Sequence, residues 1–117
     1  VQAAGAPAVY NSWRERTLQT APIDTAAEGL ATGSAFYVAV KTLIDMLDDM
    51  VLVTEEEMRD AAILIARTAH VIAEEAGAAA TAAASRMADR LRTKRVAMIV
   101  SGGNVPMDHL RRLLRDA

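Results

Sequence analysis

Apolar residues recur along much of this chain with the period of a helix. Between Ser34 and Asp49 they follow one another at three- and four-residue spacing, which predicts an amphipathic helix. A second helix is predicted from Thr54 to His70, because Thr54 and Glu57 have the spacing of a capping box. Further helices are predicted over residues 6–16, 78–91 and 106–115.

Two short runs are continuously apolar instead. Met50–Val53 and Val96–Val100 have the length of buried strands, and the second reads as a strand covered on both faces. Thr17–Pro22 is expected to be extended, and Ile23–Gly33 to be a loop or a brief helical turn. Helices that alternate with short strands predict an α/β fold with a parallel sheet. Two strands make an incomplete sheet, so further strands are expected to precede Val1 or to come from another chain.

Composition narrows the class of protein. A chain of 117 residues is expected to form one domain, and 52% apolar residues exclude a disordered chain. A net charge of −2 gives no general attraction to nucleic acid or to anionic lipid, and no apolar run is long enough to span a membrane. The absence of cysteine excludes thiolate chemistry and fits a cytoplasmic location, and no signal segment opens the chain.

The first candidate site is the segment Ser101–Asn104, which directly follows the predicted strand Val96–Val100. Ligands of open α/β sheets bind outside the carboxyl ends of the strands. Gly102 and Gly103 let a backbone approach a ligand closely, and Ser101 supplies one hydroxyl. An ordinary strand-to-helix turn explains the same residues equally well.

Two further segments carry weaker signals. Glu74–Ala78 places two carboxylates before a glycine, and Thr25–Ala31 places a glycine among small residues. A solvated helix start and a plain loop are the simpler interpretations. The two histidines, His70 and His109, have no spacing that suggests a shared metal site, so no metal ligand is predicted. Neither lysine, Lys41 nor Lys94, has the surroundings of a Schiff-base-forming amine, so no catalytic side chain is predicted.

Taken in order, these segments resemble the carboxyl-terminal part of fold-type II pyridoxal-phosphate enzymes. The resemblance is to the threonine/serine dehydratases (ammonia-lyases) and the serine racemases. It rests on VQAAGAPAVYNSW, DTAAEGLA, DDMVLVTEEEM, AEEAGAAA and VAMIVSGGN, and it covers nearly the whole chain. It implies an open, mostly parallel sheet with helices on both faces, like that of the tryptophan synthase β-subunit, incomplete as given.

The resemblance implies a role for six residues in binding pyridoxal 5′-phosphate. Ser101 matches the serine that hydrogen-bonds the pyridine nitrogen, which makes the ring a mild electron sink suited to β-elimination. Gly102, Gly103 and Asn104 complete that loop. Glu74 matches a glutamate near the ring, and Gly29 matches a glycine whose backbone lies beside the cofactor.

Two features of the family have no counterpart in this sequence. In several relatives a Glu and an Asp near the first segment bind a divalent cation, whereas residues 2–8 here contain no carboxylate. The family's Schiff-base lysine and its glycine-rich phosphate loop precede the matched region. Residues 1–117 are therefore expected to be the distal part of the larger cofactor-binding domain, with no second domain, and to be inactive alone.

The resemblance implies a parent enzyme that converts threonine or serine to a 2-oxo acid and ammonia, as a cytoplasmic homodimer. A serine racemase and a hydroxyectoine-pathway dehydratase are alternatives within the family. A naturally split enzyme would carry the lysine on a second polypeptide. A non-catalytic α/β interaction module is the alternative from another class, and an upstream lysine would distinguish the enzyme from the module.

Overall fold

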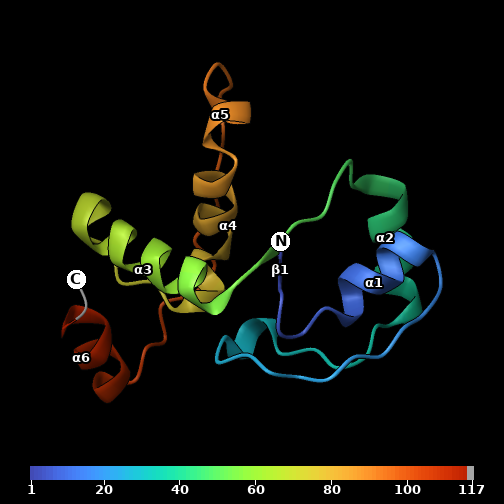
Figure 1. The fold of residues 1–117 in the computed structure, drawn as a ribbon, viewed down its shortest axis with the longest axis horizontal. Coiled ribbons are helices and arrows are strands. Elements are labelled where there is room, and N and C mark those ends of the chain that lie inside the picture. Colours follow the sequence, from blue (N-terminus) through green and yellow to red (C-terminus); the bar gives the residue numbers. More distant parts are fainter. Residues whose placement is uncertain (116–117) are drawn as a thin grey trace.

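The chain forms two groups of elements joined by a short parallel strand pair (Figure 1). The structure, a computed structural model, describes residues 1–115 and measures 41 × 36 × 18 Å along its principal axes. One dimension of 18 Å leaves room for little more than one layer of helices on a strand pair. The elements are β1 (Gln2–Ala3), α1 (Ala8–Glu15), the 3₁₀ turn η1 (Glu28–Leu30), α2 (Tyr37–Met46), β2 (Leu52–Val53), α3 (Glu55–Ala69), α4 (Glu75–Arg86), α5 (Ala88–Leu91) and α6 (Met107–Arg115).

The strands β1 and β2 are parallel, as the alternation of helices and apolar runs predicts. Gln2 lies opposite Leu52, and the backbone N–H of Gln2 donates to the carbonyl oxygen of Val51 over 2.8 Å. The N–H of Ala4 donates to Val53 over the same distance. The strand expected over 50–53 is thus shorter than predicted, because only Leu52 and Val53 have a residue of β1 opposite them.

The prediction that Val96–Val100 is a strand, covered on both faces, is wrong in both respects. The segment is not a strand, and its large side chains are exposed, up to 77% for Ile99. An extended run becomes a strand only when a neighbour satisfies its N–H and C=O groups. Among the described residues, β1 and β2 pair with each other, and neither lies in a ladder with this run.

The core lies where α3 packs against α4 and the two strands. Nine of the twelve residues in its buried cluster are alanines, and Met58 is the largest fully buried side chain. Small side chains let the two helices approach closely, although each buries little area. Thr54 and Glu57 form the predicted capping box at the start of α3. His70 ends that helix in the left-handed conformation, with φ of 56°.

Three helix boundaries differ from the prediction. Helix α4 begins at Glu75 instead of Ala78, so Gly77 lies inside its first turn and does not interrupt it. The predicted continuous helix to Leu91 is broken at Met87 into α4 and α5. Helix α2 is confined to Tyr37–Met46, whereas the apolar period extends on both sides of it.

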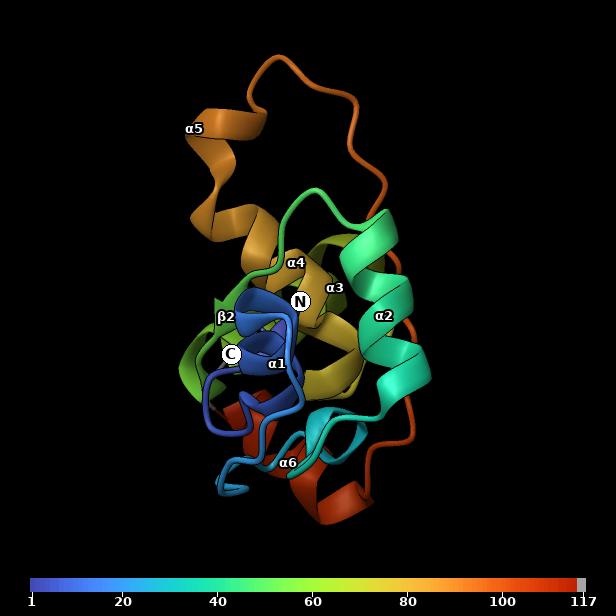
Figure 2. The same ribbon diagram turned by 90° about the vertical axis from the view of Figure 1, so that its right-hand side faces the viewer.

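Helices α1 and α2 form the second group and lie beside each other in both views (Figures 1 and 2). Buried Ser12 ties α1 to the following loop, since its hydroxyl accepts from the N–H of Gln19 over 2.8 Å. Phe36, Tyr37 and Val38 at the start of α2 are each at least 67% exposed. Within residues 1–115, no helix has the length and apolar composition needed to cross a lipid bilayer.

Candidate functional site

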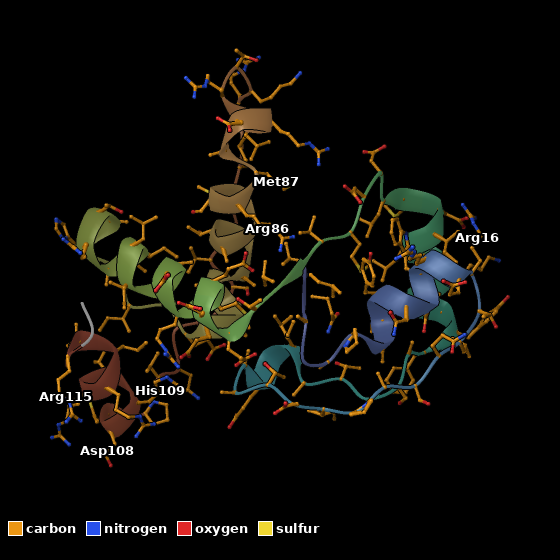
Figure 3. The ribbon with its side chains drawn as sticks, in the orientation of Figure 1. Arg16, Arg86, Met87, Asp108, His109 and Arg115 are labelled. Atoms are coloured by element: carbon orange, nitrogen blue, oxygen red, sulfur yellow. The ribbon has the colours of Figure 1, made fainter. Side chains whose placement is uncertain are left out.

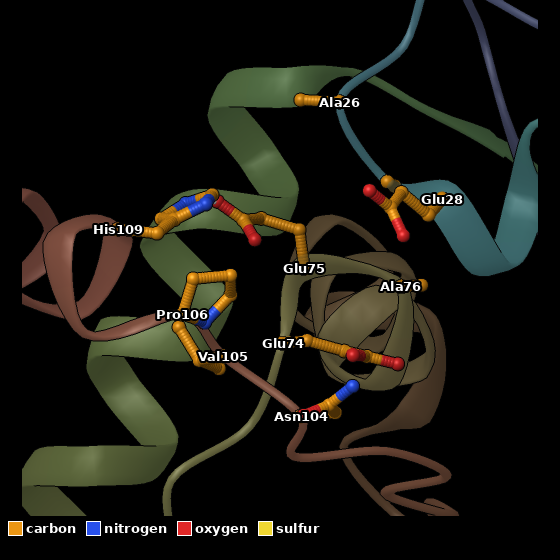
Figure 4. Close-up of a pocket in the computed structure, with 10 residues that line it drawn as sticks. Ala26, Glu28, Glu74, Glu75, Ala76, Asn104, Val105, Pro106 and His109 are labelled. Atoms are coloured by element: carbon orange, nitrogen blue, oxygen red, sulfur yellow. The ribbon is translucent and has the colours of Figure 1, made fainter.

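Three segments that lie far apart in the sequence meet at the N-terminal end of α4 (Figure 4). They are the approach to η1, the first turn of α4 with the residues before it, and the loop that leads into α6. Together they enclose a cavity of about 140 Å³. Its lining residues are Ala26, Ala27, Glu28, Glu74, Glu75, Ala76, Asn104, Val105, Pro106 and His109. The three candidate segments of the sequence are thus parts of one place in the fold.

Gly102 lies against the start of α4. Its carbonyl oxygen accepts a hydrogen bond of 3.1 Å from the backbone N–H of Glu74. A Cβ on Gly77 would lie against that same oxygen and 2.8 Å from the Gly102 nitrogen. A Cβ on Gly102 would in turn overlap the carboxylate of Glu74. Two glycines are therefore needed here so that a loop and a helix can touch through their backbones.

Gly103 has a similar requirement on the other side of the loop. A Cβ there would lie 2.6 Å from the carbonyl oxygen of Ile72, in the segment that leads from α3 to α4. The glycines predicted to let a ligand approach thus first allow the loop to pack closely against the rest of the protein. Asn104, the next residue, lines the cavity together with Glu74.

The segment Thr25–Ala31 is held in place by Glu55 in the first turn of α3. One carboxylate oxygen of Glu55 accepts from the Thr25 hydroxyl over 2.6 Å, and the other accepts from the N–H of Ala26 over 2.9 Å. This arrangement brings Gly29 so close to α4 that a Cβ on it would lie 3.0 Å from the Cβ of Ala76. Gly29 itself is exposed, and its neighbour Glu28 lines the cavity.

Ser101 is the predicted site residue that the structure places apart from the cavity. It is exposed and is not part of the cavity lining. Glu74 and Asn104 line the cavity, while Gly29, Gly102 and Gly103 shape the segments around it. Ser101 thus lies on the exposed part of the same loop.

The cavity is rich in hydrogen-bond acceptors. Glu28, Glu74 and Glu75 bring three carboxylates to it, and the Asn104 amide adds both a donor and an acceptor. The first turn of α4 directs unpaired backbone N–H groups to the same end, and these stabilise nearby negative charge. Such a lining suits a ligand that presents N–H or O–H donors.

The pair of Glu75 and His109 closes one side of the cavity. The two side chains join through Glu75 Oε1 and His109 Nε2 at 2.5 Å, and Glu75 is only 7% exposed. His109 lies on the side of α6 that faces α3 and α4, whereas Asp108 lies at its outer end (Figure 3). Sequence reasoning considered His109 only as a metal ligand and missed this contact, which spans 34 residues. Among the described residues, no cluster of three metal-ligating side chains occurs.

The cavity fits one wall of a cofactor site. A volume of about 140 Å³ is below the roughly 300 Å³ at which small-molecule sites begin. Asn104 and Glu74 present their polar groups to the cavity, while Gly102 and Gly103 lie against Glu74 and Ile72 outside its lining. Ser101, at the outer edge, is open to a ligand that extends beyond this wall.

Comparison with known proteins identifies the family of the chain. The model of a family described as "Pyridoxal-phosphate dependent enzyme" matches residues 1–102. An L-threonine ammonia-lyase of Thermotoga maritima is 32% identical over 115 residues, which are 97% of this chain and 28% of that protein. A serine racemase of Schizosaccharomyces pombe is 31% identical over 84 residues, which are 72% of this chain and 26% of that protein.

A solved structure shows the same fold. The crystal structure of a T.th. threonine deaminase superposes with a TM-score of 0.83 at 26% identity, over 91% of this chain and 36% of that one. The predicted α/β fold of fold type II is thus confirmed, although the sheet formed by residues 1–115 has two strands. The chain spans about a quarter to a third of the length of the relatives it matches.

Proposed function

The chain belongs to the pyridoxal-phosphate dependent enzymes, and on this basis we propose that it forms the distal part of a larger cofactor-binding domain. The complete enzyme would eliminate the β-hydroxyl of L-threonine or L-serine and release a 2-oxo acid and ammonia. The L-threonine ammonia-lyase match over 97% of the chain supports this choice of reaction. The proposal extends to a cytoplasmic homodimer that binds neither nucleic acid nor membrane.

The observation that carries the proposal is the meeting of three short motifs at one helix end. Glu28–Gly29, Glu74–Gly77 and Gly102–Asn104 are separated by tens of residues, and all three border the same cavity or its walls. A loop that needed glycine only for its turn would have no reason to touch the other two segments. This convergence supports a binding site over three unrelated turns.

Each residue of this wall has a distinct task in the proposal. Ser101 would place its hydroxyl at the ring nitrogen of the cofactor, as the family resemblance implies, and its exposure leaves that hydroxyl accessible. Glu74 and Asn104 would contact the ring from the cavity side. Gly29, Gly102 and Gly103 would keep the backbone close enough for these contacts.

Pyridoxal phosphate, when bound, withdraws electrons from the α-carbon of an amino acid, so that the α-proton becomes acidic and a β-substituent can leave. The strength of that withdrawal depends on what lies at the ring nitrogen. A serine hydroxyl leaves the nitrogen largely without a proton, whereas a carboxylate would hold a proton on it. Ser101 would therefore favour elimination over reactions that need a stronger electron sink.

A racemase is the second candidate within the family, because the serine racemase of S. pombe is 31% identical over 72% of the chain, against 32% over 97% for the ammonia-lyase. Elimination and racemisation both begin with loss of the α-proton. In elimination the β-hydroxyl then leaves, whereas in racemisation a proton returns to the α-carbon from the other side. A hydroxyectoine-pathway dehydratase would share the elimination but not the substrate. A non-catalytic module would carry out none of these reactions.

The test uses the complete protein and the variant Ser101→Ala. Loss of one hydrogen bond at the ring nitrogen is expected to shift the cofactor's absorption maximum and to lower kcat about tenfold. The matched control is Ser85→Ala, an exposed serine on α4 whose loss is expected to leave both readouts unchanged. Unchanged spectrum and turnover in Ser101→Ala would contradict the role given to Ser101.

Product analysis separates the candidate reactions. Incubation with L-threonine and L-serine is followed by assays for 2-oxo acid, ammonia and D-serine. Release of 2-oxo acid and ammonia supports the dehydratase, and formation of D-serine without them supports the racemase. A protein with neither product and no cofactor absorbance would be the interaction module. Light scattering of the same preparation tests the homodimer.

A further inference from the structure

The side chain of Gln2 makes an unusual contact with η1. It binds Leu30, the residue next to Gly29, which lies against α4. The residue lies in β1 and is 6% exposed. Its side-chain nitrogen Nε2 donates to the carbonyl oxygen of Ala6 over 3.0 Å and to that of Leu30 over 3.0 Å. One amide group therefore ties the turn after β1 to the last residue of η1, 28 residues away.

Two carbonyl oxygens that converge on one point both carry partial negative charge, so a hydrogen-bond donor or a cation is needed between them. The Gln2 amide has two N–H groups, and these satisfy both oxygens at once. The opposite orientation of the amide would set its oxygen against two further oxygens, so the two acceptors fix the orientation. Removing the donors would leave the buried Ala6 carbonyl without its partner, which is costly, and would break the tie to Leu30, whose carbonyl keeps only the N–H of Thr32 at 2.8 Å.

A divalent cation is the other kind of partner that could join such oxygens. The family resemblance implies a cation bound by carboxylates near this segment, yet residues 2–8 contain none. Mg²⁺ and Ca²⁺ bind to oxygen ligands, mostly charged ones. An N–H group at the point between Ala6 and Leu30 repels a cation, so the residues present do not fit one.

We propose that the Gln2 side-chain amide takes the place of a divalent cation and makes this tie independent of metal. The tie matters for the site because Leu30 and Gly29 belong to the same 3₁₀ turn, and Gly29 lies against the first turn of α4. The amide thus helps to hold η1 beside the cavity. This inference concerns the structure and does not depend on which reaction the protein catalyses.

The test is the substitution Gln2→Glu in the complete protein. It keeps the shape of the side chain but replaces two donors with a carboxylate that faces two carbonyl oxygens. Thermal unfolding is measured in EDTA and with MgCl₂, CaCl₂ or MnCl₂ at constant ionic strength. In EDTA, the variant's midpoint is expected to fall by about 5 °C, and a divalent cation is expected to restore most of that loss.

Two controls make the outcome specific. The wild-type midpoint is expected to be the same in EDTA and in cation. Gln19→Glu, which makes the same charge change at the only other glutamine of the chain, is expected to show no cation response. A saturable rise of the wild-type midpoint with cation would overturn the proposal, and so would a Gln2→Glu protein that no cation stabilises.

If Gln2→Glu does not fold, Gln2→Met provides the second measurement. It removes the donors without adding charge, so its midpoint is expected to fall and to stay low in every cation. A Gln2→Met protein as stable as wild type would show that the amide is not a tie and would overturn the proposal. These midpoints need no turnover, so a wrong assignment of the reaction would leave their interpretation intact.

Discussion

Replacing Gly77 by alanine sets two opposing effects against each other inside one helix. Gly77 lies in the first turn of α4, where alanine is a better helix former by about 1 kcal/mol. Against this gain stands the backbone of Gly102, whose carbonyl oxygen occupies the place of the new methyl group. We expect the contact to outweigh the gain.

The magnitude follows from what must move. The new Cβ would also lie 2.8 Å from the nitrogen and 3.1 Å from the carbonyl carbon of Gly102, so backbone and not a flexible side chain has to give way. Overpacking of this kind costs about 1–3 kcal/mol. Retreat of the loop also strains the 3.1 Å hydrogen bond from Glu74 to Gly102, which contributes about 1 kcal/mol. After the gain in helix propensity, Gly77→Ala is expected to lower the free energy of unfolding by about 1–3 kcal/mol.

Urea-induced unfolding of the complete protein measures this loss, and cofactor absorbance reports whether the loop has shifted. Ala80→Gly in the middle of the same helix measures the propensity effect alone and is expected to cost about 1 kcal/mol. A Gly77→Ala protein that is more stable than wild type by the amount Ala80→Gly loses would contradict this prediction. It would show that the loop yields without cost.

Two further predictions concern helix ends. Glu75→Gln and His109→Gln are each expected to loosen α6 from α4. Because Glu75 is buried, a double-mutant cycle in urea unfolding should give a coupling energy of at least about 1 kcal/mol between the two side chains. Additive effects of the two substitutions would show that the contact is not energetically coupled. His70→Gly is expected to raise the unfolding free energy by about 1 kcal/mol, since φ of 56° strains a side-chain-bearing residue. The same measurement would contradict this prediction if the variant were less stable.

The parts of the fold that depend on neighbours in sequence were predictable. Thr54 and Glu57 are three residues apart, and their capping box forms as expected. A parallel sheet was predictable from the alternation of helices and apolar runs, although the strand that pairs with β2 is β1, which was not predicted. Val96–Val100 was predicted wrongly because its composition indicates burial, while a strand also needs a partner that composition does not reveal.

The candidate site likewise has parts that were predictable from local sequence and contacts between distant residues that were not. Sequence reasoning identified Glu74, Gly102 and Asn104 as candidates, and the structure brings them together at the start of α4. Their role toward a cofactor remains a prediction. The contacts of Gln2 with Leu30 and of Glu75 with His109 were missed, because each joins residues about thirty positions apart and leaves no local pattern.

The alanine interface between α3 and α4 also determines how the site can change. Alanine has no χ angles, so its burial costs no rotamer entropy, and the two helices meet mostly through side chains that cannot adopt a second conformation, with Met58 and Ile65 of α3 as the exceptions. The first turn of α4 is therefore positioned by helix axes and not by adjustable side chains. Any shift of Glu74 and Glu75 relative to the loop must move the helix as a rigid body. Such a construction favours a fixed wall over an adaptable one.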